Sequence, residues 1–192
     1  MASDVATTTG VLDPTCALVL VDLQVVTMSF PAAHNMGTVV AHAARLASSF
    51  RERALPVVLT VADLNHPPAG RTQFARPRAE VPSASLALSD ALGADESDIV
   101  LTKSGWGAFQ GTDLDETLRA RGVTQVVVAG LATGFGVEST ARQAYDAGYH
   151  VMLVVDAMTG PDLEGHDHTV ARVFPALGQV VTTDEVLASL ND

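Results

Sequence analysis

The sequence predicts a three-layer α/β/α domain whose central sheet is mainly parallel, Rossmann-like and built of about six strands. Short continuous apolar runs recur along the chain, and amphipathic stretches with helical periodicity alternate with them. No internal repeat or low-complexity linker interrupts this alternation, which is typical of one α/β unit. We therefore expect residues 1–12 to form an N-terminal tail and residues 13–192 to form a single domain.

The first part of this domain is predicted to supply two strands and a long helix between them. Residues 16–21 (CALVLV) are apolar throughout, as in a strand buried on both faces, and residues 55–61 have the same character. Over residues 35–53 apolar side chains recur at spacings of four, three and four, which predicts one buried face of a helix: Val39, Ala43, Leu46 and Phe50.

Residues 63–84 interrupt the alternation and predict a long loop. The segment contains one glycine and four prolines: Pro67, Pro68, Gly70, Pro77 and Pro82. Connections of roughly 20 residues without secondary structure are uncommon in compact domains and often functional. We expect this segment to form a wall or a lid of a ligand site, followed by a short helix over residues 83–92.

The rest of the chain resumes the alternation. Strands are predicted over residues 99–101, 125–128, 150–155 and 180–181, and helices over residues 134–147, over residues 165–174 and from residue 184 onward. Thr112 followed by Asp115 resembles a capping box and predicts one more helix that begins there. Because α/β proteins bind ligands beyond the carboxyl ends of their strands, the residues directly after each apolar run are the candidate site residues.

Composition excludes several classes of function. The 22 acidic residues against 11 Lys and Arg give a net charge of −11, which argues against a nucleic-acid or anionic-membrane partner. The single cysteine, Cys16, excludes an intramolecular disulfide and a multi-cysteine zinc site. No apolar run approaches the ~20 residues of a membrane span, and residues 1–10 lack a signal-peptide pattern. We expect a cytoplasmic protein with a small-molecule substrate.

Three segments at predicted strand ends can carry chemistry. Asp22 follows the first strand and fits a general acid or base, a ligand anchor or a simple turn cap. Lys103 follows the third strand and is either an ordinary loop lysine or the partner of Asp22. Residues 130–136 (GLATGFG) open a helix, and their glycines serve either a tight turn or a close approach to an anionic or oxyanion-bearing ligand. Their spacing is not the dinucleotide fingerprint.

Together these segments resemble the isochorismatase-like hydrolase superfamily, which also contains nicotinamidases and N-carbamoylsarcosine amidases. The matching segments are ALVLVDLQ at residues 17–24, TKSGWGAFQGTDLDETLRARGV at residues 102–123, and VVVAGLATGFGVESTARQAYDAGYHVMLVVDAM at residues 126–158. The resemblance extends over about residues 13–190 and is weakest over the long loop.

Most members of the superfamily use an Asp, Lys and Cys triad. The resemblance places Asp22 and Lys103 at the first two positions and Gly136 at the position of the nucleophilic cysteine. It also implies a cis peptide bond at Leu131–Ala132, with the backbone amides of Ala132 and Gly136 facing the substrate as an oxyanion hole. Members commonly form dimers or tetramers, so a homodimer or homotetramer is expected.

No other side chain is placed to replace the missing thiol. Cys16 begins the strand that Asp22 follows, and six strand residues span roughly 20 Å, so we interpret it as a small buried side chain. Ser139 and Thr140 lie about one turn into the following helix, where packing or hydrogen bonding to the preceding turn explains them better than catalysis. An ordinary cysteine amidase is therefore disfavoured.

Isochorismatases provide a precedent, since they too carry glycine at this position and hydrolyse an enol ether with release of pyruvate. That reaction needs an acid, which Asp22 would supply if burial raised its pKa above the reference value of ~3.9. Lys103 would orient Asp22 or bind a substrate carboxylate. Those enzymes carry a longer arginine-containing stretch where this chain has residues 104–107 (SGWG), so the substrate stays open.

The aromatic residues near the strand ends are candidates to line a substrate pocket. Trp106, Phe109 and Phe135 fit an apolar lining, although plain packing also explains them, and His34 follows the Asp22 strand and is a candidate for the pocket border. Two other readings stay open: a nicotinamidase- or N-carbamoylsarcosine amidase-type amidohydrolase whose cysteine has been replaced at Gly136, and a noncatalytic small-molecule binding or assembly protein.

No metal or cofactor is expected. Nicotinamidase-like members carry an Asp and several His residues after the second strand, whereas this chain offers one of each, Asp63 and His66. His166 and His168 are two residues apart in a predicted helix, so they point to different faces and are interpreted as solvated.

Overall fold

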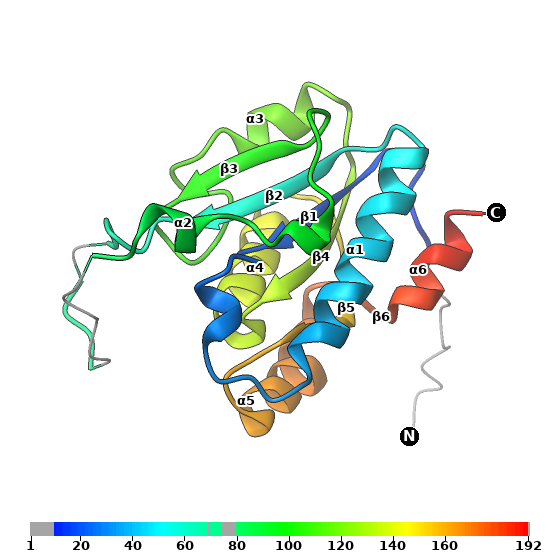
Figure 1. Cartoon of the computed structure of the whole chain (residues 1–192). Helices are drawn as coiled ribbons and strands as arrows, with labels where there is room; N and C mark the ends of the chain where they lie inside the picture. The colour runs from blue at the N-terminus through cyan, green and yellow to red at the C-terminus, as the bar shows by residue number, and fades with distance from the viewer. Residues whose placement is uncertain (1–9, 69, 74–79, 192) are drawn as a thin grey trace, which may run out of the picture.

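The computed structural model describes residues 10–68, 70–73 and 80–191. Its centre is a six-stranded sheet with the order β3-β2-β1-β4-β5-β6, in which every pair of neighbours is parallel (Figure 1). The strands are β1 (Cys16–Val21), β2 (Val57–Ala62), β3 (Ile99–Lys103), β4 (Gln125–Leu131), β5 (His150–Thr159) and β6 (Gln179–Val181). The chain runs outward from β1 to β3 and then returns to β4 on the other side of β1, which creates a topological switch point between β1 and β4.

Helices cover both faces of the sheet. They are α1 (Met36–Glu52), α2 (Ser83–Leu86), α3 (Leu114–Arg119), α4 (Glu138–Asp146), α5 (Leu163–His168) and α6 (Thr183–Ser189). One hydrophobic core contains the buried faces of α1 and α6, and a second contains those of α3 and α4. In Figure 1, α1 and α6 lie in front of the sheet and α4 behind it. The predicted three-layer α/β fold is confirmed.

Strand β1 shows why its sequence is apolar throughout. All six of its residues are buried. Cys16, Leu18 and Leu20 belong to the core under α1, whereas the residues between them face the opposite core. Because successive side chains of a strand point to opposite faces, a strand between two helical layers needs apolar residues at every position.

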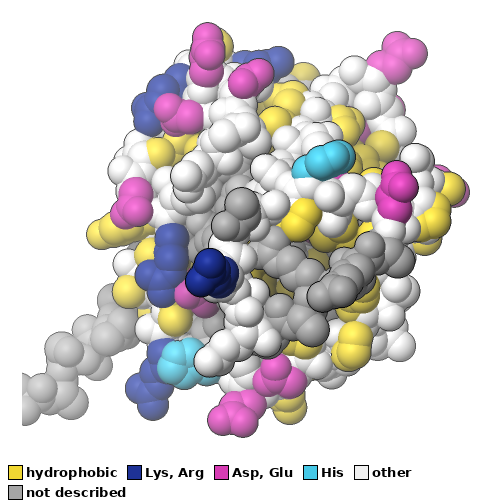
Figure 2. Space-filling view, turned by 90° about the vertical axis from the view of Figure 1, so that its left-hand side faces the viewer, with side chains coloured by type: hydrophobic (Ala, Val, Ile, Leu, Met, Phe, Trp, Pro, Cys, Tyr) yellow, Lys and Arg dark blue, Asp and Glu magenta, His cyan; other side chains and the backbone are white. Residues whose placement is uncertain are grey.

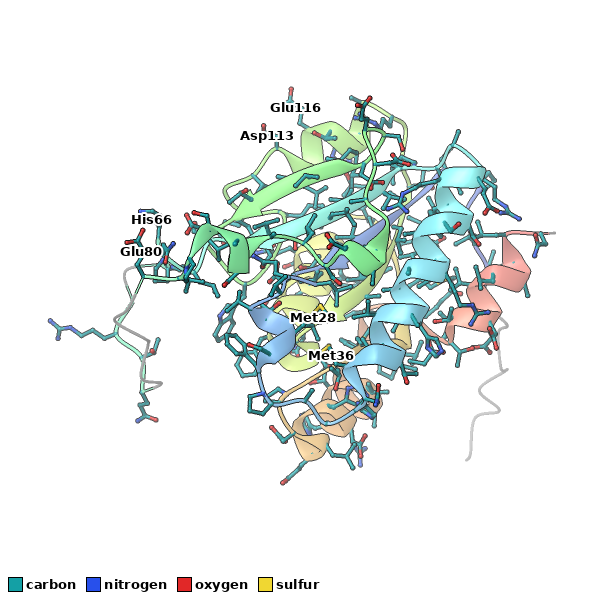
Figure 3. The ribbon with its side chains drawn as sticks, in the orientation of Figure 1. Met28, Met36, His66, Glu80, Asp113 and Glu116 are labelled. Carbon is teal, nitrogen blue, oxygen red and sulfur yellow. The ribbon has the colours of Figure 1, made fainter. Side chains whose placement is uncertain are left out.

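The described parts of the loop predicted over residues 63–84 extend away from the sheet at the carboxyl ends of β2 and β3 (Figure 1). The Asn65 side chain links the two ends of the loop. Its NH₂ group donates to the carbonyl of Val81, and its oxygen accepts from the backbone amide of Val81. Figure 3 labels His66 and Glu80 on this outward part of the molecule. Pro77, one of the residues that predicted the loop, lies outside the described residues.

Three predictions about helix boundaries are wrong. The helix predicted over residues 83–92 is the short α2 followed by a 3₁₀ turn (Asp90–Leu92). Thr112 is not the cap residue of α3, which is Asp113; the Thr112 hydroxyl accepts from the Leu114 amide and donates to the carbonyl of Ala108. The segment predicted as one helix over residues 165–174 is α5 followed by a turn of π-helix (Thr169–Val173) and a 3₁₀ turn. None of the described helices is long and apolar enough to cross a membrane.

Candidate active site

A cavity of about 1330 Å³ opens at the carboxyl ends of the central strands. Figure 2 shows this face of the molecule: hydrophobic side chains lie in several small groups across it, and most acidic side chains lie towards its edge. The described parts of the long loop contribute one wall of the cavity, as the sequence predicts. Six of the predicted site residues line it: Asp22, Lys103, Trp106, Ala132, Phe135 and Gly136.

Asp22 lies at the end of β1 with a backbone conformation that is unusual for a residue with a side chain. Its φ is 51°, in the left-handed region. Thr60, a fully buried residue of β2, holds this conformation from both sides. The Asp22 amide donates to Thr60 Oγ1 at 3.1 Å, and the same hydroxyl donates to Asp22 Oδ1 at 2.6 Å. Neighbouring strands thus fix both the backbone and one carboxylate oxygen of Asp22.

Lys103 holds the other oxygen of that carboxylate. It ends β3, its side chain is 1% exposed, and its Nζ donates to Asp22 Oδ2 at 2.7 Å. The same ammonium donates to the carbonyls of Trp106 at 2.8 Å and Gly105 at 3.2 Å. An ammonium group has three N–H donors, and these three oxygens engage all of them. Lys103 therefore orients Asp22 and the loop after β3, with no N–H left for a ligand.

The environment changes the acidity of Asp22 in the direction that acid catalysis needs. Burial raises the pKa of Asp22 above its ordinary value, because water is excluded from around the carboxylate. The charge of Lys103 and the hydrogen bonds from Lys103 and Thr60 lower this pKa, but their effect is smaller than that of burial.

The backbone of β4 closely approaches Asp22 at the switch point between β1 and β4. Gly130 has a φ of 111°, and a Cβ built there would lie 2.2 Å from the carbonyl oxygen of Val21. Only glycine tolerates both the conformation and the contact. The turn that follows β4 is thereby brought beside the residue that follows β1.

That turn is built around Gly136. The Leu131–Ala132 peptide bond is cis, as the resemblance predicts, and a turn of π-helix (Thr133–Val137) follows it. A Cβ built on Gly136 would lie 3.4 Å from Asp22 Oδ2 and 2.6 Å from the carbonyl oxygen of Leu131. The side-chain position at residue 136 therefore points at Asp22, but a side chain there requires the backbone around Leu131 to move.

The aromatic residues separate into two groups. Trp106 and Phe135 line the cavity, and their rings meet edge to face with centroids 5.1 Å apart. Phe109 is not among the lining residues, because its ring packs against Tyr149, 5.6 Å away, in the core under α3 and α4. The interpretation of Phe109 as a packing residue is therefore correct, and its interpretation as a pocket residue is wrong.

His34 and His166 correct two further predictions. His34 does not line the cavity that contains Asp22; it lines a separate cavity of about 430 Å³ together with His166. His166 is buried rather than solvated, with its ring 4.5 Å from that of His34 and its Nδ1 2.8 Å from Thr133 Oγ1. A helix position alone could not reveal this, because the hydrophilic α5 packs one face against the turn after β4. His168 is exposed, as predicted.

The other possible nucleophiles lie where packing explains them, with one exception. Cys16 is buried at the opposite end of β1 from Asp22, and burial raises the pKa of its thiol to about 11. The Thr140 hydroxyl donates to the carbonyl of Gly136 at 2.7 Å, which is the predicted bond to the preceding turn. Ser139, however, lines the cavity, as does Gln143 one turn further along α4. Sequence reasoning missed this polar contribution of α4 to the cavity wall.

Among the described residues, no group of three or more His, Cys, Asp or Glu side chains lies close enough together to hold a metal ion. Asp63 and His66 form a pair, with His66 Nδ1 2.9 Å from Asp63 Oδ2, and their side chains lie at the cavity wall. This hydrogen bond holds the pKa of the Asp63 carboxyl below its usual range.

Comparison with known proteins agrees with this fold. The family model described as the isochorismatase domain matches residues 16–185. The chain belongs to the isochorismatase family. Within that family it is 35% identical over 184 residues to the isochorismatase family protein YecD of Escherichia coli O157:H7, and the alignment covers 92% of this chain and 96% of YecD.

Solved structures of isochorismatase-family proteins share its fold. A structure of an isochorismatase family protein from Burkholderia thailandensis superposes with a TM-score of 0.91 at 40% identity, covering 95% of this chain and 99% of that one. N-carbamoylsarcosine amidase from Thermoplasma acidophilum superposes with a TM-score of 0.71 at 26% identity, covering 88% and 97% of the two chains. The superfamily resemblance inferred from the three sequence segments is confirmed.

Proposed function

We propose that this isochorismatase-family protein is a small-molecule hydrolase that works without a thiol and uses Asp22 as its general acid and base. The observation that carries the proposal is the position of the Asp22 carboxyl. Asp22 lines the open cavity, its Oδ2 lies 3.4 Å from the position that a Cβ on Gly136 would take, and Lys103 donates to that same oxygen. Burial raises the pKa of Asp22, which favours a protonated carboxyl that can donate.

Enol-ether hydrolysis is the reaction class that such a site fits best. The Asp22 carboxyl gives its proton to the terminal vinyl carbon, and the π electrons form the new C–H bond. The ether oxygen stabilises the resulting cation, and a water molecule adds to it while its proton passes to the Asp22 carboxylate. The hemiketal then collapses to a ketone, and its hydroxyl proton leaves with the departing alcohol. One water is consumed, and Asp22 is regenerated as the acid.

The surrounding residues would assist this reaction in different ways. Lys103 and Thr60 each donate to one oxygen of Asp22 and so fix the orientation of its carboxyl group. The backbone amides of Ala132 and Gly136 would bind an oxygen of the substituent next to the reacting carbon. Trp106 and Phe135 supply apolar surface for the departing group.

The proposal is tested by measuring alcohol release from a panel of enol ethers. The panel contains isochorismate, followed by pyruvate formation, together with 2-phenoxyacrylate and 2-phenoxyacrylamide, both followed by phenol release. We expect turnover of at least one compound and a loss of about 10²–10⁴-fold in Asp22→Asn, the usual contribution of a general acid. Undiminished turnover in Asp22→Asn, or no turnover of any of the three compounds, would contradict the proposal.

An amidohydrolase whose cysteine has been replaced is the second candidate. The fold that this chain shares with N-carbamoylsarcosine amidase and the direction of the residue-136 side-chain position towards Asp22 favour it. The 2.6 Å approach of a Cβ to Leu131 disfavours it, because the turn fits glycine. Gly136→Cys should create hydrolysis of N-carbamoylsarcosine or nicotinamide if this candidate is right, with Gly136→Ala as the control for displacement of the backbone.

A further inference from the structure

The turn after β4 carries Ala132 and Gly136, which line the large cavity and whose amides the proposed function assigns to the substrate. Two hydrogen bonds are internal to this turn, since the backbone amides of Phe135 and Val137 both donate to the carbonyl of Ala132, at 2.9 and 3.2 Å. These two bonds shape the turn but do not place it relative to the neighbouring elements. Its position depends on contacts from outside.

His166 of α5 provides one such contact. Its Nδ1 lies 2.8 Å from the hydroxyl oxygen of Thr133, the residue that follows Ala132, and Thr133 is completely buried. A buried hydroxyl that loses its hydrogen-bond partner costs stability, so this bond favours one position of Thr133 over others. Because Thr133 lies between Ala132 and Gly136 in the chain, His166 acts on the part of the turn that connects the two cavity-lining residues.

His34 keeps the His166 ring in place. The two rings meet edge to face, with centroids 4.5 Å apart and an angle of 63° between their planes. His34 is itself tied to β5, since its backbone amide and its Nδ1 lie 3.1 and 3.0 Å from the hydroxyl oxygen of Thr159. Thr159 pairs with Leu131 at the end of β4 and lines the large cavity. The two imidazoles thus connect the end of the sheet with Thr133 in the turn.

Thr169 follows His166 by three residues and forms a second contact between the same segment and the turn. Its hydroxyl donates to Glu138 Oε2 at 3.0 Å, and Thr169 is buried. A Cβ built on Gly134 would lie 3.3 Å from the same hydroxyl oxygen, so the two segments approach each other closely. Thr133 begins the turn and Glu138 follows it directly. The segment from His166 to Thr169 therefore contacts both ends of the turn.

We propose that His166 and Thr169 are positioning residues of the candidate active site. They hold the turn after β4 in the place where the backbone amides of Ala132 and Gly136 can bind a substrate. Neither His166 nor Thr169 lines the large cavity, so each acts through the residue to which it is hydrogen bonded. The inference rests on the proposed function for what the amides bind, but the position of the turn can be measured without a substrate.

A set of substitutions separates these hydrogen bonds from simple packing. Leucine and asparagine both branch at Cγ, so His166→Leu and His166→Asn each place an atom near the position of Nδ1, but only asparagine can form a hydrogen bond with the Thr133 hydroxyl. Thr133→Val and Thr169→Val each remove one hydroxyl with little change of shape. His168→Leu and His168→Asn make the same changes on an exposed residue of the same helix and are the matched controls.

Hydrogen exchange of backbone amides measures how firmly the turn is held. Exchange at Phe135 and Val137 requires opening of their bonds within the turn. In His166→Leu and Thr133→Val it should be about fivefold or more faster, because each change leaves a buried polar group without its partner or removes its bond. Thr169→Val should accelerate it about threefold. His166→Asn should stay within about twofold of the unsubstituted protein, and amides in the middle of β4 should change by less than about twofold in every variant.

Turnover of an enol ether gives the second measurement. In His166→Leu and Thr133→Val kcat/KM should fall about fivefold or more, because displaced amides lose their contact with the substrate, and it should recover in His166→Asn. The double variant of His166→Leu and Thr133→Val should lose little more than either single variant, since both substitutions remove the same hydrogen bond. The two His168 variants should equal the unsubstituted protein in both measurements.

The outcomes separate this inference from the proposed function. Unchanged exchange in the turn of Thr133→Val, or exchange that rises equally throughout β4, would overturn the inference whatever the result with enol ethers. It would also be overturned if His166→Asn behaved like His166→Leu, or if faster exchange left kcat/KM undiminished. Should His166→Leu fail to fold, Thr133→Val tests the same hydrogen bond. Faster exchange confined to the turn, in a protein that hydrolyses none of the enol ethers, would sustain the positioning of the turn and overturn the Asp22 chemistry.

Discussion

Thr60→Val is the substitution that best separates a positioned acid from an ordinary buried carboxylate. Valine has nearly the shape of threonine, so the strand and the packing of β2 are retained. The change removes one hydroxyl that accepts from the Asp22 amide at 3.1 Å and donates to Asp22 Oδ1 at 2.6 Å. Two hydrogen bonds of the acid are thus lost, while Lys103 and its bond to Oδ2 remain.

The expected loss of stability follows from those two bonds. A hydrogen bond to a charged group contributes about 1.5–3 kcal/mol and a neutral one about 0.5–1.5 kcal/mol. Burial of the added methyl group offsets roughly 1 kcal/mol of this. We expect the free energy of unfolding, measured by urea denaturation, to fall by about 1–3 kcal/mol. Thr102→Val, an exposed strand residue of β3, is the matched control and should change it by less than about 0.5 kcal/mol.

Thr60→Val should also shift the pH dependence of activity in a direction that a merely structural role of Thr60 would not produce. The Thr60 hydrogen bond lowers the pKa of Asp22, so its removal raises this pKa further. Since Asp22 must be protonated to act as an acid, activity is lost as pH rises through its pKa. In Thr60→Val the descending limb of the pH–rate profile should therefore move to higher pH. An unchanged limb in an active, folded variant would refute Asp22 as the titrating acid.

Three further substitutions test the rest of the site and its supports. Lys103→Met should also move the descending limb of the pH–rate profile to higher pH, because the charge of Lys103 lowers the pKa of Asp22. It should reduce kcat about tenfold or more, since the Asp22 carboxyl is no longer held in one orientation. An unshifted pH–rate profile would contradict this. Gly136→Ala should lower the free energy of unfolding by about 1–3 kcal/mol, since the added Cβ would lie 2.6 Å from the carbonyl oxygen of Leu131. An unchanged urea denaturation curve would contradict the close packing of this turn around glycine. Burial lowers the pKa of His166, so folding favours the neutral ring and the free energy of unfolding should fall as pH drops below about 6.5. His166→Gln should therefore show a smaller decrease in Tm between about pH 7 and pH 5 than the unsubstituted protein. An identical decrease in the two proteins would count against a buried neutral ring.

The sequence predicted the fold and the Asp22–Lys103 pair for the same physical reason. A strand between two helical layers must be apolar on both faces, so β1 is visible as a continuous run that ends abruptly at Asp22. The carboxyl ends of parallel strands share one edge of the sheet. Residues 81 positions apart in the chain, Asp22 and Lys103, therefore meet there, at 2.7 Å.

Other parts of the site carry no sequence signal of their own. Thr60 lies within an apolar run, where a β-branched threonine is an ordinary strand residue, and only the pairing of β1 with β2 places its hydroxyl at Asp22. Ser139 and Gln143 became interpretable once the turn at Gly136 fixed which face of α4 meets the cavity. Thr112 is not the cap residue of α3: its hydroxyl donates to the backbone carbonyl of Ala108, four residues earlier in the chain, and accepts from the Leu114 amide, and the helix begins after Asp113.

The turn after β4 is packed closely around residue 136, the position at which most members of the superfamily carry the nucleophilic cysteine. A simple replacement of cysteine by glycine would leave space at residue 136, whereas here the Leu131 carbonyl oxygen lies only 2.6 Å from the position that a Cβ would take. The backbone itself thus forms the wall opposite the Asp22 carboxyl, and the volume in front of it is free for a substrate. The turn fits glycine at residue 136, and the site retains the buried Asp22–Lys103 pair beside a large open cavity. These features favour the proposed thiol-independent chemistry over the loss of an amidase nucleophile.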